Sequence, residues 1–146
     1  MTLSAKQLIG AWVLREWRIE YPHNKVRHPF GADAIGQLLY THDGQMSATV
    51  SADKRPAQHH SNPRQLGENQ KAQAFDSYFH YAGSWSIESD IVIHRVDFSL
   101  NPDFIGSIQR RRARLIDGRQ LTLSAEETTA DKGPRQHILE WLKTDI

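Results

Sequence analysis

Short apolar segments, separated by turn residues at fairly regular intervals, run along most of the chain. This rhythm is typical of an antiparallel all-β meander rather than of alternating strands and helices. It predicts eight strands, over residues 10–21, 35–42, 45–51, 85–88, 91–100, 105–116, 119–126 and 136–143. The clearest hairpin joins the second and third of them, because Asp43-Gly44 tolerates the positive φ angles of a tight turn.

The first predicted strand changes its inward face part-way along. Trp12 and Leu14 share one phase of the alternation, whereas Trp17, Ile19 and Tyr21 share the other. One extra residue would reconcile the two phases, so we predict a β-bulge near positions 15 and 16.

One segment has helical periodicity. Residues 68–82 place Ala72, Phe75, Phe79 and Ala82 at helical spacing, and Gly83 follows as a C-terminal stop. This predicts a helix of about 15 residues, which would lie across or beside the mouth if the strands close into a barrel. Residues 51–66 before it are polar and contain two prolines, which indicates a surface excursion long enough to act as a flap.

An open sheet of eight twisted strands would leave two unpaired edges, and one helix cannot cover either face. Closure into a barrel removes both problems, and the interior then holds side chains or one small ligand. We therefore predict an all-β fold, a closed antiparallel eight-stranded barrel with one internal helix. With 146 residues and 38% hydrophobic composition, residues 1–146 should form a single domain.

The charge and cysteine content exclude several classes of function. Lys plus Arg number 18 against 17 Asp plus Glu, so no net field attracts nucleic acid or an anionic membrane. The absence of cysteine excludes disulfides, thiolate catalysis and sulfur-ligated metal sites. Neither a signal peptide nor a membrane-spanning run is evident, which predicts a cytoplasmic protein.

Polar residues of the sixth predicted strand alternate between the two faces of the sheet. Arg110, Arg112 and Arg114 cannot all face a closed core, so their face is solvent and Gln109 and Arg111 point inward. Stacking aromatic residues do not interleave with these arginines, which argues against a nucleic-acid surface. The adjacent His59 and His60 lack a spaced third ligand, so no metal site is expected.

The partner strand gives an independent test of this assignment. Its inward phase comprises Val92, His94, Val96, Phe98 and Leu100. A four-residue loop over residues 101–104 would place His94 opposite Arg111. In the following hairpin, a three-residue loop with Gly118 in the left-handed region would place Leu121 opposite Leu115.

Arg111 and His94 are the candidate catalytic residues, and each has an alternative structural role. A buried guanidinium needs a carboxylate, carbonyl groups, water or a ligand anion, or Arg111 could stack on Trp12 to seal the barrel. His94 could be a core histidine with one hydrogen-bond partner, but a nearby guanidinium would keep it neutral and able to accept a proton. Further candidate ligand-binding residues are Gln109, Tyr40, Tyr78, Tyr81, Trp85 and Trp141.

Several motifs resemble those of a known family. Gly10-Ala11-Trp12 is similar to the Gly-x-Trp signature of lipocalins, and a longer ordered series resembles the bacterial and fungal lipocalin-like domain proteins. That series runs through residues 28–31, 36–47, 74–78, 81–83 and 94–123. The chain departs from secreted lipocalins in lacking cysteines and in its internal helix. The resemblance implies a small barrel but no single chemistry, and some relatives belong to polyketide pathways.

Three functions fit these expectations. The first is a binder that encloses an apolar or aromatic molecule and meets its polar groups with Arg111, Gln109 and His94. The second is a cofactor-independent cyclase, isomerase or dehydratase of a polyketide-like or phenolic compound, in which His94 moves a proton and Arg111 stabilises an enolate or phenolate. The third is a scaffold with a filled interior. A small molecule is the expected partner, and a homodimer is possible.

Overall fold

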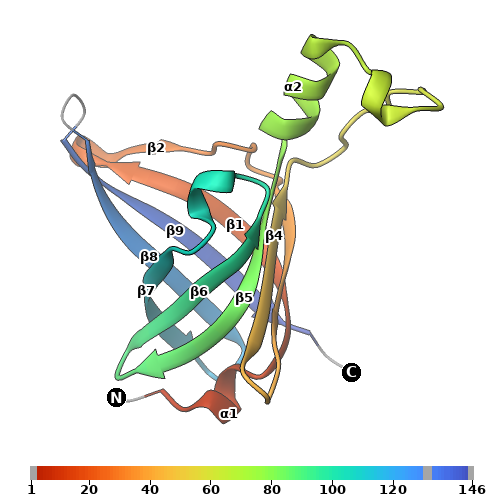
Figure 1. The fold of residues 1–146 in the computed structure, drawn as a ribbon. Coiled ribbons are helices and arrows are strands. Elements are labelled where there is room, and N and C mark those ends of the chain that lie inside the picture. The colour runs from red at the N-terminus through yellow and green to blue at the C-terminus, as the bar shows by residue number, and fades with distance from the viewer. Residues whose placement is uncertain (1–2, 130–132, 145–146) are drawn as a thin grey trace.

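The computed structural model describes residues 3–129 and 133–144, and eight of its strands form a closed antiparallel barrel (Figure 1). Hydrogen bonding between the first and last strands closes the sheet. The barrel strands are β1 (Gly10–Tyr21), β3 (Ile35–Tyr40), β4 (Gln45–Ser51), β5 (Tyr78–Glu88), β6 (Ile91–Ser99), β7 (Ile108–Ile116), β8 (Gln120–Thr129) and β9 (Gly133–Lys143). A short strand, β2 (Lys25–Arg27), pairs with the end of β1. The predicted fold class is therefore correct apart from its helix.

Short helical segments lie at the two ends of the barrel. The α-helices are α1 (Ala5–Leu8) and α2 (Glu68–Asp76), and the 3-10 helices are η1 (Pro22–Asn24), η2 (Pro63–Gln65) and η3 (Pro102–Phe104). Figure 1 shows α1 at one end, with η3 and α2 at the other. Sequence periodicity did not reveal α1, because four residues are too few to show a helical period.

Buried side chains close the end of the barrel next to α1. Trp12 is fully buried and its Nε1 donates a hydrogen bond to the carbonyl of Leu8 at 2.9 Å. The Nζ atom of Lys143 lies 4.7 Å from the Trp12 ring centroid and donates to the carbonyl of Ile9 at 2.6 Å. Lys143, and not Arg111, therefore provides the cation over Trp12, and the alternative that Arg111 stacks there is wrong.

The predicted helix over residues 68–82 is too long. It ends at Asp76, and residues from Tyr78 onward belong to β5, which also begins well before the predicted position 85. The reason is a contact distant in sequence. Strand β5 pairs with β4 from Ser51↔Tyr78 to Gln45↔Ser84, and so provides hydrogen-bond partners for the backbone N–H and C=O groups along that edge of β4. Gly83 is accordingly not a helix stop but a strand residue.

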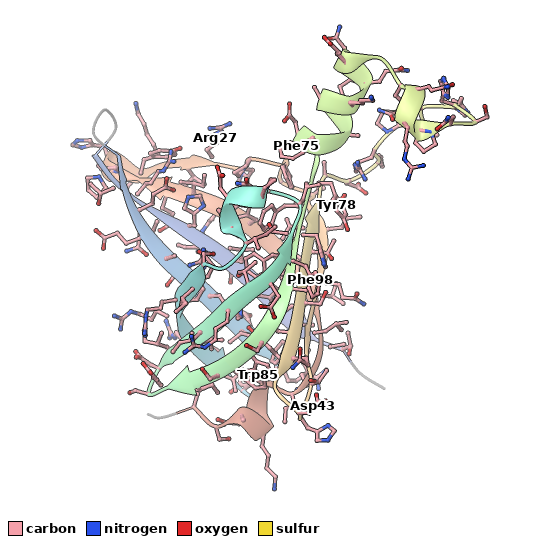
Figure 2. All side chains as sticks on the ribbon, in the orientation of Figure 1. Arg27, Asp43, Phe75, Tyr78, Trp85 and Phe98 are labelled. Carbon is pink, nitrogen blue, oxygen red and sulfur yellow. The ribbon has the colours of Figure 1, made fainter. Side chains whose placement is uncertain are left out.

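The helix α2 projects beyond the barrel rim rather than across the mouth (Figure 1). None of its residues is buried, and Phe75 is 49% exposed (Figure 2). The predicted surface excursion before it is also found, since the residues between β4 and α2 are mostly exposed.

Strand β6 contains a bulge that the sequence did not reveal. Gly83 pairs with Val96 and Ala82 pairs with Phe98, so Asp97 is the extra residue. The bulge reverses the alternation beyond Val96. Phe98 is consequently 68% exposed on the outer surface, and its predicted inward orientation is wrong (Figure 2).

The predicted pairing of β6 with β7 is displaced by two residues. His94 lies opposite Gln109, and Val92 lies opposite Arg111. The connection is longer than four residues because η3 and Gly106, with a φ of 83°, extend it and β7 starts only at Ile108. A displacement of two preserves the side-chain face, so Gln109 and Arg111 still point inward.

Two register predictions are confirmed. The pairing of β1 with β9 shifts between Leu14 and Glu16, which places the bulge at the expected position. In the hairpin of β7 and β8, Leu121 lies opposite Leu115, and Gly118 has a φ of 68° in the left-handed region.

Candidate functional site

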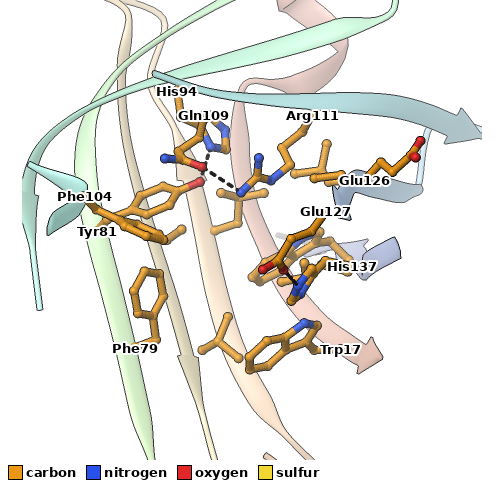
Figure 3. Close-up of a pocket in the computed structure, with 17 residues that line it drawn as sticks. Trp17, Phe79, Tyr81, His94, Phe104, Gln109, Arg111, Glu126, Glu127 and His137 are labelled. Carbon is orange, nitrogen blue, oxygen red and sulfur yellow. Dashed lines mark hydrogen bonds and ion pairs between the residues drawn. The ribbon is translucent and has the colours of Figure 1, made fainter. Parts of the chain in front are cut away.

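The barrel interior contains a cavity of about 480 Å³, within the size range of small-molecule sites. Its wall is mainly apolar, formed by Trp17, Leu38, Ala48, Val50, Phe79, Phe104, Leu123, Ala125, Leu139 and Trp141. Its polar lining residues are Tyr81, His94, Gln109, Arg111, Glu126, Glu127 and His137 (Figure 3). An interior of this size argues against the scaffold function, which requires a filled barrel.

His94 is held by two tyrosines. It is 2% exposed and lies at an inward position of β6. Its Nε2 lies 2.7 Å from the Tyr40 hydroxyl, and its Nδ1 lies 2.6 Å from the Tyr81 hydroxyl. The three residues therefore form a hydrogen-bonded chain, Tyr40–His94–Tyr81, of which His94 and Tyr81 reach the cavity wall.

Burial keeps this chain uncharged. Burial, and to a smaller extent the positive charge of Arg111, together lower the pKa of His94 to about 3. The predicted neutrality of His94 thus holds, but its main cause is burial rather than the guanidinium. Burial also raises the pKa of the Tyr40 and Tyr81 hydroxyls.

Arg111 and Gln109 form a second polar group on the neighbouring strand. The Nη2 of Arg111 donates to Oε1 of Gln109 at 3.1 Å, and its Nη1 donates to the carbonyl of Arg110 at 3.0 Å. The amide of Gln109 in turn donates to Oγ of Ser107 at 2.8 Å. Because a guanidinium can only donate, this chain fixes the orientation of the Gln109 amide. No carboxylate hydrogen-bonds to Arg111 among the residues that the structure describes.

A carboxylate and an imidazole occupy another part of the wall. Glu127 accepts hydrogen bonds from Arg135 at 2.9 and 3.2 Å and lies 2.6 Å from Nε2 of His137. Hydrogen bonds from Arg135 and His137 lower the pKa of the Glu127 carboxyl. The His137 ring stacks on Trp17, with ring centroids 6.2 Å apart. This carboxylate is therefore already paired with a guanidinium.

Two tryptophans in the wall have unused donors. The indole Nε1 atoms of Trp17 and Trp141 are buried and have no hydrogen-bond partner within residues 3–129 and 133–144. A buried donor without an acceptor is unfavourable, so water or a bound molecule with acceptor oxygens would relieve it.

Nearly the whole chain matches a known family. The family model for the lipocalin-like domain matches residues 9–144. The chain belongs to the lipocalin-like domain family. A search of the curated proteins found no significant match. Among solved structures, a redesigned β-barrel aligns over 99% of this chain and 98% of its own, with 11% identity and a TM-score of 0.47.

Most of the predicted site residues surround the cavity of this lipocalin-like barrel. His94, Arg111, Gln109, Tyr81 and Trp141 line it, and their roles in binding or catalysis stay predictions. Two others lie outside the cavity wall and support it: Tyr40 hydrogen-bonds to His94, and Trp85 packs against Tyr40 with the rings tilted by 38° and their centroids 4.5 Å apart. Tyr78 is not in the wall, because its ring packs under the guanidinium of Arg55.

Sequence reasoning missed Glu127 and His137. The alternation of inward and outward side chains along a strand could have located both. His137 is in phase with Leu139 and Trp141, and Glu127 is in phase with Leu123 and Ala125. The predicted strand ended at Glu126, whereas β8 continues to Thr129 and includes Glu127. Phe79 was missed because it was assigned to the helix.

Metal ligands and membrane-spanning helices are two further features that could indicate a function. Among the described residues, no group of three or more His, Cys, Asp or Glu side chains is placed to hold a metal ion. No helix within the same residues has the length and apolar character needed to cross a membrane.

Proposed function

We propose that this lipocalin-like protein binds a small aromatic or largely apolar organic molecule that carries an anionic or strongly electron-rich oxygen. The observation that carries the proposal is the guanidinium of Arg111 at an otherwise mainly apolar cavity. Its hydrogen bonds go to a neutral amide and a backbone carbonyl. A ligand carboxylate, phenolate or enolate would supply a negative charge to pair with Arg111 and would accept hydrogen bonds from the remaining N–H groups of its guanidinium.

A matched pair of fluorescent probes tests this function. Anilinonaphthalenesulfonate and phenylnaphthylamine share the same aromatic body, but only the first carries an anion. We expect both to bind, and Arg111→Met to weaken only the sulfonate, by about tenfold, the value of one charged hydrogen bond. Arg112→Met is the control, because Arg112 is on the outer face of the same strand and pairs with Asp90. Equal weakening of both probes, or of neither, would contradict the role of Arg111.

The second candidate is a cofactor-independent enzyme acting on a polyketide-like or phenolic molecule. The Tyr40–His94–Tyr81 chain favours it, because a hydrogen-bonded chain that ends at a cavity can transfer protons. Both ring nitrogens of His94 are occupied by tyrosine hydroxyls, so any proton exchange with a substrate would pass through Tyr81. This differs from direct proton transfer by His94.

Substitution of His94 separates the two candidates. His94→Gln retains a donor and an acceptor, so a binder should keep most of its affinity for a molecule that co-purifies with the wild-type protein and is identified by native mass spectrometry. An enzyme should convert that molecule about a hundredfold more slowly while still binding it. A proton NMR spectrum of that molecule that is unchanged after prolonged incubation with the wild-type protein would favour the binder, because it would exclude isomerisation as well as dehydration.

A further inference from the structure

Hydrogen-bond satisfaction fixes the direction of the Tyr40–His94–Tyr81 chain. A neutral imidazole has one donor and one acceptor nitrogen, so one tyrosine donates to the ring and the other accepts from it. The tyrosine that accepts keeps its own hydroxyl proton, which then needs a further acceptor. The two tyrosines differ in whether they can reach one.

Within residues 3–129 and 133–144, the hydroxyl of Tyr40 has no such acceptor. It is 2% exposed, does not line the cavity, and its hydroxyl contacts only Nε2 of His94 among the described residues. If Tyr40 accepted from the ring, its own proton would be buried and unpaired, which disfavours that arrangement by about tenfold or more. Tyr81 lines the cavity, so its hydroxyl proton can point to a molecule inside.

We infer that Tyr40 donates to Nε2 of His94, that Nδ1–H of His94 donates to Tyr81, and that Tyr81 therefore presents its hydroxyl proton to a carbonyl or anionic oxygen of the ligand. His94 and Tyr40 are positioning residues in this arrangement, and Tyr81 contacts the ligand. The ligand part of the inference rests on the proposed binding function, whereas the direction of the chain does not.

The other polar groups of the wall select the same ligand class. The indole N–H groups of Trp17 and Trp141 and the remaining N–H groups of Arg111 are all donors. Two acceptors of the wall are already used, since Gln109 Oε1 accepts from Arg111 and the Glu127 carboxylate accepts from Arg135, and the third, the Glu126 carboxylate, belongs to an exposed residue. The cavity thus offers several donors to an aromatic molecule rich in acceptor oxygens, such as a polyketone or a phenolate.

Nitrogen NMR of the imidazole rings tests the chain without any ligand. Long-range proton–nitrogen spectra distinguish a protonated ring nitrogen from a bare one, and His94→Gln assigns the signal. We expect His94 at neutral pH to carry its proton on Nδ1. Tyr81→Phe should preserve this tautomer, because Tyr40 still donates, whereas Tyr40→Phe should weaken the preference. A proton on Nε2 in the wild-type protein would overturn the inference.

A ketone and its hydrocarbon analogue test the contact with the ligand. Acetylnaphthalene and ethylnaphthalene have nearly the same shape, and quenching of the cavity tryptophans reports their binding. We expect Tyr81→Phe to weaken acetylnaphthalene several-fold and ethylnaphthalene not at all, with Tyr78→Phe as the control outside the cavity. The infrared carbonyl band of bound acetylnaphthalene should lie at lower frequency in the wild type than in Tyr81→Phe.

The two experiments fail in distinguishable ways. An identical carbonyl band in the wild type and in Tyr81→Phe would overturn the Tyr81 contact even if both naphthalenes bind. If neither naphthalene binds, the proposed binding function fails and the ligand contact fails with it. The tautomer measurement would then still decide the direction of the chain.

Discussion

His94 illustrates how one residue can be structural and functional at once. Both of its ring nitrogens have partners, so the hydrogen-bond requirement of a core histidine is met. Yet it also lines the cavity beside Arg111. A neutral imidazole in such a place cannot attract an anion, but it can fix the direction in which its neighbours donate.

The buried His94 should make the protein sensitive to acid. Its folded-state pKa of about 3 lies below the unfolded value of about 6.5, so the unfolded chain binds the proton more readily. The stability that it contributes is complete above pH ~6.5 and is lost as the pH falls toward about 3. Between pH 7 and pH 5 we expect the free energy of unfolding to decrease by about 2 kcal/mol more in the wild type than in His94→Gln.

Urea denaturation at the two pH values measures this difference. Because the same seven other histidines remain in both proteins, the comparison isolates His94. Parallel losses of stability in the wild type and His94→Gln would show that His94 is not kept neutral by the fold.

Lys143 should stabilise the closed end of the barrel. Its ammonium group contacts the Trp12 ring and donates to the carbonyl of Ile9, contacts that Lys143→Met would remove while keeping the aliphatic stem. We expect a loss of about 1 to 2 kcal/mol in the free energy of unfolding, measured in urea. Lys71→Met on the exposed face of α2 should change it by less than about 0.5 kcal/mol. A loss of the same size in both variants would be inconsistent with this role.

At the scale of elements, the sequence predicted a strand well wherever apolar and polar side chains alternate regularly along it and no helical period competes. Parity alone placed Gln109 and Arg111 inside, and it survived an error of two residues in register because side chains repeat every two residues. Phe79 fits two periods at once, helical with Phe75 and alternating with Tyr81, and only the open edge of β4 decides between them. The bulge at Asp97 has no local signal, so the outward orientation of Phe98 could not be predicted.

Gly83 should be indispensable to the pairing of β5 with β6. A Cβ atom added there would lie 1.8 Å from the backbone carbonyl oxygen of Arg95, which cannot move without breaking the sheet. We expect Gly83→Ala to lower the free energy of unfolding by about 3 kcal/mol or more. Gly67→Ala is the matched control, because the nearest atom to its added Cβ would be 3.8 Å away and its effect should be small. Thermal unfolding monitored by circular dichroism compares the two, and similar melting temperatures would argue against the close approach.

The whole molecule combines one packed end with one ligand-sized cavity. The closed end is formed by α1, Trp12 and Lys143, none of which lines the cavity. The long excursion of residues 53–76 does not line it either. The backbone N–H of Ala52 donates to the carbonyl of Ser77 at 2.9 Å, so the two ends of this excursion are already adjacent.

Replacing residues 53–76 by Asn-Gly therefore tests whether the excursion is a flap. A two-residue turn can join Ala52 to Ser77, and shortening a loop stabilises the fold by roughly 0.6 kcal/mol for each halving of its length. We expect a barrel at least as stable as the wild type in urea, with the same affinity and association rate for phenylnaphthylamine measured by stopped-flow fluorescence. A shortened protein that binds the probe much faster would instead identify the excursion as a barrier to entry. Weakened binding at unchanged stability would show that it covers the ligand, which is the flap that its length suggests.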